Sequence, residues 1–318
     1  MAGHPDDQQD LVERGARPLQ AEAGPFHFGR ALAAIITRQG LTDLAYFGGA
    51  SAPLASEAHL QEALDRARGE KRVVVNNYHS TDWAVVPEAE ILVGLADRLR
   101  TDNALGWVLA HDGDRQVEPL PASAASRADL DTPADVAMIA RHPGLGPEVG
   151  RVAESLPQPI LNRLDQLLQI LRTPGRTLSV IGRASSTVWQ ALEARRQVWI
   201  RMFAEERGML ASGRAERGEV RSLIGAMVDQ AGPRAFLRSL GSMSDGAIWD
   251  TRVWMSQRGP WPSAADRFSA DLGRAGDIED GALRELTAAV EEASLPIVTG
   301  GHGVVAGGLL ALLESLEP

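Results

Sequence analysis

The chain of 318 residues contains no cysteine, and Lys71 is its one lysine. The absence of cysteine excludes disulfides, thiolate metal sites and cysteine nucleophiles, so a metal ion would need carboxylate, imidazole or backbone oxygen ligands. Long apolar runs are missing too. The longest, from Gly303 to Leu313, is well short of the ~20 residues that a membrane-spanning helix needs, so we expect no membrane partner.

The charge and the start of the chain limit the partners and the location. A formal net charge of −10 argues against a nucleic-acid backbone as the main partner, so we expect no nucleic acid. The first 25 residues are polar and acidic, and they lack the basic start and apolar centre of a secretory signal. We therefore expect a tail over residues 1–25 and a cytoplasmic protein, and a homo-oligomer stays open.

Alternating strand and helix patterns predict an α/β fold with two domains. In the first half, a helix over 28–39 ends at Gly40, where a C-terminal glycine cap belongs. The other elements expected there are strands over 45–47 and 72–75, helices over 57–68 and 91–99, and a hairpin made by 105–114 and 115–120. The predicted division is a tail over 1–25, a domain over 26–150, a linking helix within 151–175 and a second α/β domain over 176–318.

The stretch LAYFGGASAPLASEAHLQEAL, from Leu44 to Leu64, combines a strand, a glycine turn and a helix for which Ser56 is the expected cap. With the polar loop NNYHSTD and the later segment DLDTPAD, it resembles the nucleotidyltransferases of the molybdenum-cofactor guanylyltransferase and 2-phospho-lactate guanylyltransferase kind. The resemblance covers about residues 28–143. It implies a nucleotidyltransferase-like, Rossmann-type sandwich for the first domain, a nucleotide or phosphorylated small molecule as ligand, and Mg²⁺ as cofactor.

Two motifs of that family differ in this chain. In the family the strand ends in Gly-Asp-x-Pro-Leu and the Asp holds magnesium, whereas Ser51 stands at that position here. The family's phosphate-binding loop, of the form Leu-Ala-Gly-Gly-x-Ser-x-Arg-Met, is absent before Phe28. The resemblance still implies substrate contacts from Gly49 and Ser51. The sequence leaves open a divergent transferase and a catalytically inactive scaffold that binds a ligand or a protein.

The polar loop after the strand at 72–75 carries candidate catalytic and substrate-binding residues. The resemblance places substrate at this loop, so Asn76 and Asn77 are expected to bind it. His79 and Asp82 could form an oriented acid–base pair and are candidate catalytic residues. The alternative is a solvated loop in which Asn and Asp side chains satisfy turn backbone.

The segment DLDTPAD, residues 129–135, offers carboxylates for a metal. By the resemblance, Asp129 or Asp131 would bind magnesium. A helix start explains the same residues without a metal, because Thr132 suits the N-cap, Pro133 the first helical position and Asp135 the third position after the cap. Both interpretations stay open.

The second half shows no family resemblance, and its expected elements come from local pattern alone. They are a leucine-rich helix over 161–172 that packs between domains, strands over 177–181, 197–203, 247–257 and 295–299, helices over 188–195, 220–230 and 233–240, and a closing helix after 302. Asp250 and Arg252 are two residues apart in an expected strand, so they should face the same side and pair.

Two places in this half are candidate ligand sites. Arg183, Ser185 and Ser186 lead from a strand into a helix, where free amides and a guanidinium suit an anion, although Ser also caps helices that bind nothing. His302 lies between glycines at the end of a strand and is a third candidate catalytic residue, although glycines also serve close packing. A further hypothesis places the whole active site here, at Arg183, Asp250 and His302.

Overall fold

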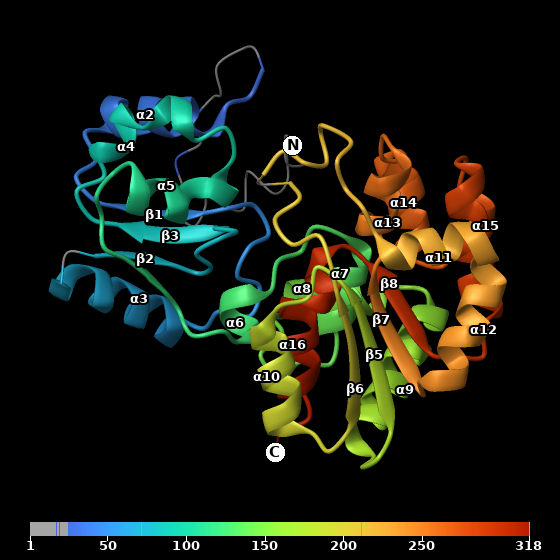
Figure 1. Cartoon of the computed structure of the whole chain (residues 1–318). Coiled ribbons are helices and arrows are strands. Elements are labelled where there is room, and N and C mark those ends of the chain that lie inside the picture. The colour runs from blue at the N-terminus through green and yellow to red at the C-terminus, as the bar shows by residue number, and fades with distance from the viewer. Residues whose placement is uncertain (1–16, 18, 20–24, 71, 211, 318) are drawn as a thin grey trace.

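A computed structural model of the chain describes residues 17, 19, 25–70, 72–210 and 212–317, and most of the expected tail lies outside this part. The fold is mixed α/β, as predicted, with two four-stranded sheets. Figure 1 shows one sheet in each half of the molecule, with helices on both faces of each. In the described part of the chain, no helix is long and apolar enough to cross a membrane.

The first sheet has the strand order β1-β3-β2-β4. Its strands are β1 (Leu44–Phe47), β2 (Val73–Val75), β3 (Trp83–Val86) and β4 (Val117–Pro119). β3 runs antiparallel to β1 and to β2, and β2 and β4 are parallel. Val73 and Val75 pack under α2 (Phe28–Gln39) and α5 (Leu105–His111), whereas Val74 packs on α3 (Glu57–Glu70), as the two-residue period of a strand requires. The mixed sheet agrees with an α/β fold, and the nucleotidyltransferase-like sandwich stays a prediction.

The helices of the first half agree with the sequence in four places and differ in one. They are α2 (Phe28–Gln39), α3 (Glu57–Glu70), α4 (Ile91–Gly94) with the 3₁₀ turn η1 (Ala96–Arg98), the 3₁₀ turn η2 (Asp102–Ala104), α5 (Leu105–His111), α6 (Ala124–Arg127) and α7 (Pro133–Ile139). Gly40 caps α2 with φ 62°, as expected. Ser56 and His59 hydrogen-bond to each other at the start of α3, which supports the expected cap.

The hairpin expected over 105–120 is wrong. Residues 105–111 form α5, and β4 pairs with β2 in parallel. The buried positions Leu105, Val108 and Leu109 follow the spacing of a helical face, but a short apolar run such as LGWVLAH fits strand and helix equally well from sequence alone.

The second sheet is entirely parallel, in the order β6-β5-β7-β8. Its strands are β5 (Thr177–Gly182), β6 (Trp199–Ala204), β7 (Gly246–Asp250) and β8 (Ile297–Gly300). One face is covered by α7, α9 (Gln158–Arg172), α10 (Ser186–Arg195) and α16 (Gly307–Glu314). The other face is covered by α11 (Leu223–Ala231), α12 (Pro233–Met243), α13 (Arg252–Arg258), α14 (Ala264–Asp271) and α15 (Gly281–Glu292).

The strand order has a switch point. From β5 the chain moves to β6 on one side, and β7 then pairs with β5 on the other side. Connections leave such a point in opposite directions, so a crevice forms between the carboxyl ends of β5 and β7, where ligands of open α/β sheets bind. The residues at these ends are Gly182 and Asp250.

Two expectations for the second half are corrected by the structure. The strand expected over 247–257 ends at Asp250, and α13 begins at Arg252. The expected pairing of the Asp250 and Arg252 side chains is therefore wrong, because residue 252 is helical and its guanidinium binds Asp271.

The leucine-rich helix α9, expected between domains, packs into the second core. Its Leu164 and Leu167 lie in one cluster with Leu178 of β5, and α7 adds Ala134 and Met138 to the same cluster. The shorter helix α8 (Pro147–Glu154) precedes it. The second core thus reaches across residue 150, and the division of the chain into folding domains stays a prediction.

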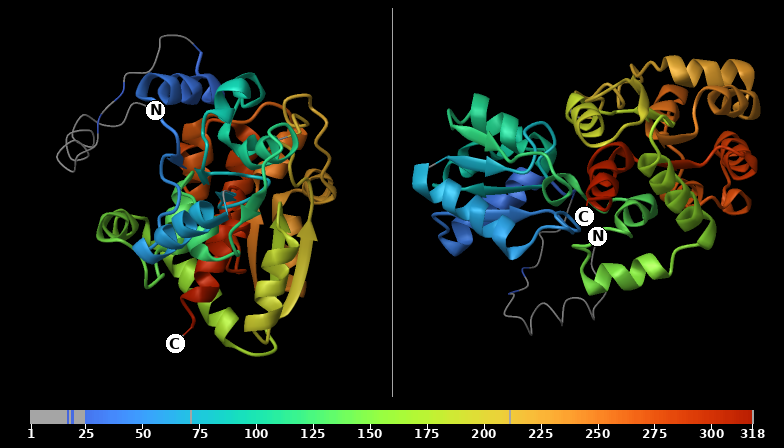
Figure 2. Two further views of the ribbon diagram at one scale, coloured as in Figure 1. Left: turned by 90° about the vertical axis from the view of Figure 1, so that its left-hand side faces the viewer. Right: turned by 90° about the horizontal axis from the view of Figure 1, so that it is seen from below.

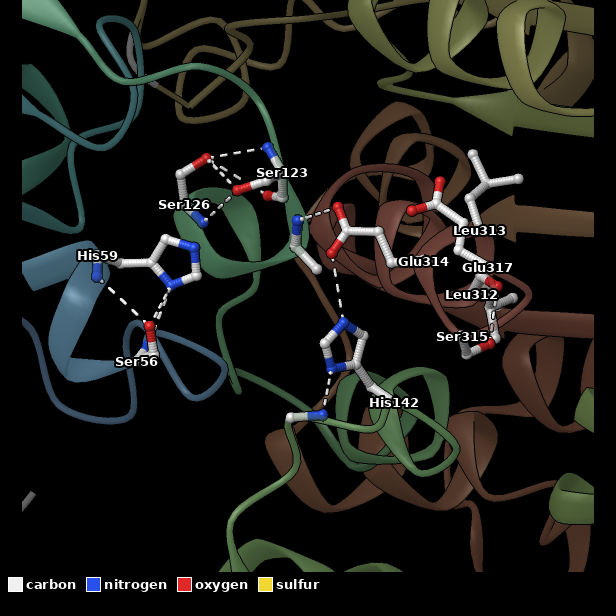
Figure 3. Close-up of polar contacts among 12 residues, drawn as sticks. Ser56, His59, Ser123, Ser126, His142, Leu312, Leu313, Glu314, Ser315 and Glu317 are labelled. Atoms are coloured by element: carbon white, nitrogen blue, oxygen red, sulfur yellow. Dashed lines mark hydrogen bonds and ion pairs between the residues drawn. The ribbon is translucent and has the colours of Figure 1, made fainter.

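The two halves meet at α16, drawn red in Figures 1 and 2. The Ala124 amide donates to Glu314 Oε1 at 2.9 Å, and His142 Nε2 lies 3.3 Å from Glu314 Oε2. Although burial raises the pKa of Glu314, these contacts hold it below its ordinary value. Figure 3 shows Glu314 and His142 pointing toward each other, while Ser123 and Ser126 bond within their own capping box. None of the described hydrogen bonds joins a serine to His142. The contacts of Glu314 with Ala124 and His142 therefore serve to hold helices together.

Gly307 allows the closest of these contacts. A Cβ at this position would lie 2.0 Å from the Arg127 carbonyl oxygen, and one at Gly308 would lie 2.8 Å from Met138 Cβ. One obstacle is a main-chain atom and the other is a Cβ fixed to the main chain, so neither can rotate away. The glycines that follow β8 therefore serve close packing.

We predict that Gly307→Ala destabilises the protein by roughly 1–3 kcal/mol, because the added methyl overpacks the contact with Arg127. Gly150→Ala in α8 is the matched control, since an added Cβ there meets nothing within 4 Å, and it should gain up to ~1 kcal/mol from helix propensity. Urea denaturation measures both. Equal stability of the two variants would contradict the prediction.

Candidate functional site

A cleft of about 490 Å³ lies between the two halves. The first half lines it with the β1–α3 loop, the loop before β3, η2 and the segment from α6 to α7; the second half lines it with residues that follow β5, β7 and β8 and with α14. The cleft thus includes the switch point of the parallel sheet.

The β1–α3 loop brings Ser51 against Asp129. These residues form an isolated antiparallel bridge, and Ser51 Oγ donates to the Gly48 carbonyl at 2.8 Å. The flanking Ala50 and Ala52 have φ values of 65° and 54°, in the left-handed region that alanine rarely adopts. The tight turn therefore holds Ser51 directly beside Asp129.

Asp82 enters the cleft from the loop before β3 and is held from behind by Asn76. The Asn76 side chain donates to Asp82 Oδ2 at 2.9 Å and accepts from the amides of Asp82 and Trp83. Burial, together with the charges of Asp102 and Asp131, raises the pKa of Asp82 to about 6 despite this hydrogen bond. A carboxyl with such a pKa can accept a proton near neutral pH.

Asp129 and Asp131 lie on the same wall and repel each other. Burial and the neighbouring charges of Asp131 and Asp82 raise the pKa of Asp129 to about 8. Burial and Asp102 also raise the pKa of Asp131, which Arg183 opposes. Tyr46 donates to Asp102 Oδ2 at 2.7 Å and fixes it at the edge of the group. The wall favours protons or a bound cation, because either would relieve the repulsion.

The expected helix start at Thr132 is confirmed. Thr132 is the N-cap of α7. Its side chain accepts from the Asp135 amide, and the Asp135 side chain accepts from the Thr132 amide, which makes a capping box, with Pro133 at the start of the helix. Burial raises the pKa of Asp135 to about 7, and its Oδ1 has no hydrogen-bond partner among the described residues. A Cβ at Gly303 would lie 2.1 Å from that oxygen, so Gly303 makes room for it.

Arg127, at the end of α6, is the cation on this wall. Its Nη2 donates to the Leu120 carbonyl at 3.2 Å, whereas its buried Nη1 has no partner in the described part of the chain. Burial lowers its pKa, and Asp82 opposes this. A buried guanidinium with unused donors favours an anionic ligand.

The opposite wall begins with Arg183 at the end of β5. Its Nε donates to Asp250 Oδ2 at 2.5 Å and its Nη2 to Oδ1 at 3.1 Å. Asp250 is 0% exposed, and Arg183 holds its pKa below the ordinary value although burial raises it. Gly182, with φ 114°, permits the approach, because a Cβ there would lie 2.6 Å from Asp250 Cβ. Asp250 thus orients Arg183, which faces the cleft.

His302 completes this wall after β8. Burial, followed by the charge of Arg183, lowers its pKa to about 4. The ring is therefore neutral at pH 7 and can offer a hydrogen bond, but it is a weak base. Asp250 does not line the cleft, so the group Arg183, Asp250 and His302 contains two cleft residues and one supporting residue.

The structure brings most of the predicted site residues into this one cleft, although they come from both halves. Those that line it are Gly49, Ser51, Asn77, Asp82, Asp129, Asp131, Arg183 and His302. From the sequence, the candidate residues of the two halves are expected to form separate sites, whereas in the structure they line facing walls of one cleft.

Four predicted residues do not line the cleft. His79 is exposed and packs edge-on against Tyr78, so its expected pairing with Asp82 is wrong. Asn76 is buried behind Asp82 and supports it instead of facing a ligand. Ser185 caps α10 through the Val188 amide, and Ser186 is exposed in its first turn, so neither reaches the cleft.

Several lining residues were missed from the sequence, namely Asp102, Asn103, Arg127, Arg252, Trp261, Arg267 and Phe268. Local pattern gives no signal for them, because each sits in an ordinary helix or loop. They join the site only through the docking of the two halves.

No group of three or more His, Cys, Asp or Glu side chains within the described ranges is arranged to hold a metal ion. A metal at Asp129 and Asp131 would therefore need further oxygen ligands from its substrate or from water, as Mg²⁺ commonly has. Comparison of the chain with protein-family models, curated proteins and solved structures found no match.

We predict that Asp129→Asn stabilises the protein at pH 8 by about 1 kcal/mol and has little effect at pH 4. With its pKa raised to about 8, the folded Asp129 binds a proton that the unfolded chain has lost, so its contribution to stability falls as pH rises from about 4 to 8. Urea denaturation at the two pH values measures this. Asp65→Asn on α3, where the carboxylate accepts from Gln61, is the control and should change neither value. A pH-independent effect of Asp129→Asn would contradict the argument.

Proposed function

We propose that the protein binds a nucleotide or another phosphorylated small molecule in this cleft and transfers a nucleotidyl or related phosphate-containing group with the help of Mg²⁺. The observation that carries the proposal is the opposition of charge across the cleft. Asp82, Asp102, Asp129 and Asp131 line one wall, and Arg183 and Arg252 line the other. A phosphate with its magnesium has both charges side by side and fits between such walls.

The carboxylate wall suits magnesium by its chemistry. Burial and then the charges of Asp131 and Asp82 raise the pKa of Asp129, and burial and Asp102 raise that of Asp131; a divalent cation would relieve the repulsion between these carboxylates. Mg²⁺ is often held by one or two carboxylates plus substrate phosphates and waters, which agrees with the small number of protein ligands here. When bound, Mg²⁺ neutralises charge that develops on phosphate oxygens.

The chain's own residues have distinct parts in this proposal. Arg127, with its unused donors, and Arg183, oriented by Asp250, hold phosphate oxygens. Asp82, held by Asn76 and with its pKa near 6, accepts the proton of the attacking hydroxyl, whose oxygen bonds to the transferred phosphorus while the phosphate or diphosphate on the other side of that phosphorus leaves. Neutral His302 donates or accepts one hydrogen bond to the ligand.

The resemblance to nucleotidyltransferases gains support from one geometric fact. Ser51, at the position of the family's metal-binding Asp, is bridged to Asp129, one of the two candidates for the second metal-binding carboxylate. The two positions that hold magnesium in the resembling family are therefore adjacent in this chain. The nature of the transferred group rests on the resemblance.

A second candidate function is ligand binding without catalysis. It is favoured by Ser51, which lacks a carboxylate and whose hydroxyl is already bonded to the Gly48 carbonyl. In this alternative the arginines still bind a phosphorylated ligand, and magnesium makes no difference.

A thermal-shift and calorimetric titration with nucleoside triphosphates, with and without Mg²⁺, tests the proposal. We expect one nucleotide to raise stability by ~2.7 kcal/mol at 100 times its Kd, in a Mg²⁺-dependent way. Asp131→Asn should abolish the Mg²⁺ dependence, whereas Asp65→Asn should keep it. A nucleotide effect that ignores Mg²⁺ supports the ligand-binding alternative, and the absence of any nucleotide effect refutes the transfer of a nucleotidyl group.

We further predict that Ser51→Asp tightens Mg²⁺ binding about tenfold, because it places a second carboxylate beside Asp129. Ser56→Asp is the matched control, since it adds the same charge at the exposed start of α3. Calorimetry with Mg²⁺ alone gives the result. Unchanged affinity in Ser51→Asp would favour the scaffold without metal.

A further inference from the structure

The second-half end of the cleft contains more cationic than anionic side chains. Arg183 pairs with Asp250, and Arg252 donates to both oxygens of Asp271 at 2.9 and 2.5 Å. These pairs are buried, with Arg252 and Asp271 each 3% exposed. Arg267, which lines the same end, forms no ion pair with any described carboxylate. Of the three arginines at this end, Arg183 and Arg252 have a carboxylate partner, and Arg267 forms no ion pair with a described carboxylate.

Arg267 is already held in position. Its guanidinium lies 5.2 Å from the centre of the Trp261 ring, and its Nη1 donates to the Pro262 carbonyl at 2.5 Å. Trp261 is itself fixed, because its Nε1 donates to Ser256 Oγ at 2.6 Å. A guanidinium that is stacked and anchored at one nitrogen loses little further freedom when its other donors bind an anion.

Apolar side chains surround this guanidinium. Leu210 is 53% exposed and Phe268 is 39% exposed, and both line the cleft with Trp261. Leu210 comes from the loop between β6 and α11, and Phe268 follows Arg267 on α14. Exposed apolar surface gathered inside a concave site, next to one unmatched charge, is typical of a small-molecule subsite.

We propose that this end of the cleft, formed by Arg267, Trp261, Phe268 and Leu210, is a subsite for a small organic anion that carries an apolar ring or chain. The carboxylate or phosphate of the anion binds Arg267, and its apolar part lies against Phe268 and Leu210. A free metal cation is disfavoured here by the surplus guanidinium, and a bare inorganic anion would leave the apolar walls in water.

The subsite is separate from the carboxylate wall used in the proposed function. Its residues belong wholly to the second half, and its charge is of opposite sign. The two ends can therefore be tested independently, since neutralising an aspartate of the first half removes none of the four subsite residues.

The experiment is calorimetric titration of the full chain with phenyl phosphate, inorganic phosphate and benzyl alcohol. We expect phenyl phosphate to bind at least tenfold more tightly than either of the others, because only it has both the charge and the ring. Arg267→Gln should weaken phenyl phosphate about tenfold. The matched control is Arg234→Gln on α12, which removes an exposed arginine paired with Glu292 and should leave the affinity unchanged.

A second variant tests the apolar contact separately. Phe268→Ala removes an exposed ring, so we expect a folded protein whose affinity for phenyl phosphate drops toward that for inorganic phosphate, while the latter stays the same. Circular dichroism checks the fold of each variant. Failure of phenyl phosphate to bind, or equal binding by wild type, Arg267→Gln and Phe268→Ala, overturns the proposal.

The aspartate variants keep the two proposals distinguishable. Asp131→Asn should bind phenyl phosphate like the wild type, even though it loses the magnesium effect. If no nucleotide binds but phenyl phosphate does so through Arg267, the subsite stands and the proposed transferase falls. If Asp131→Asn loses phenyl phosphate as well, the probe occupies the carboxylate wall and the separate subsite is refuted.

Discussion

The close approach of α16 to the chain around Arg127 and Met138 is the contact on which the cleft depends. Gly307 and Gly308 remove the side chains that would hold the two segments apart, and Glu314 then ties α16 to the Ala124 amide. The segment from 127 to 135, which carries Arg127, Asp129 and Asp131, lies next to this contact and lines the cleft. Without this contact the carboxylate wall would have no arginines opposite it.

The two walls handle charge in different ways. In the second half the two buried aspartates beside the cleft each have an arginine: Asp250 has Arg183 and Asp271 has Arg252. Burying such pairs is tolerated because the hydrogen bonds are bidentate, and removing one partner would leave a charge in a poor environment. In the first half Asp82, Asp129 and Asp131 line one wall and have raised pKa values, most strongly at Asp129. The paired charges of the second half thus support the structure, whereas the unpaired carboxylates of the first half mark the candidate functional site.

The fold could be predicted from sequence where local signals were complete. The helix over 28–39 has its glycine cap, the DLDTPAD start has its capping box, and the strands β5, β6 and β8 have flanking turns. The signals failed for 105–111, where a short apolar run fits helix or strand, and after Asp250, where the strand turns into α13. For the site, types of residue at turns pointed to Ser51, Asp82 and Arg183, but not to Arg267. Its part in the proposed subsite depends on its forming no ion pair with any described carboxylate, which only the packing reveals.

The Ala124–Glu314 hydrogen bond joins residues 190 positions apart in the chain. Closing so long a loop is slow, and contacts of this kind form late in folding. The strands of the first sheet are close together in the chain, so this sheet can form early. The contacts of α6 and α7 with α16 can form only after the segment near residue 314 has docked. We therefore expect the aspartates of the first half to pass through a stage in which they are solvated and lack the opposing arginines. Ligand binding should consequently appear in the slowest refolding phase, after most of the secondary structure has formed.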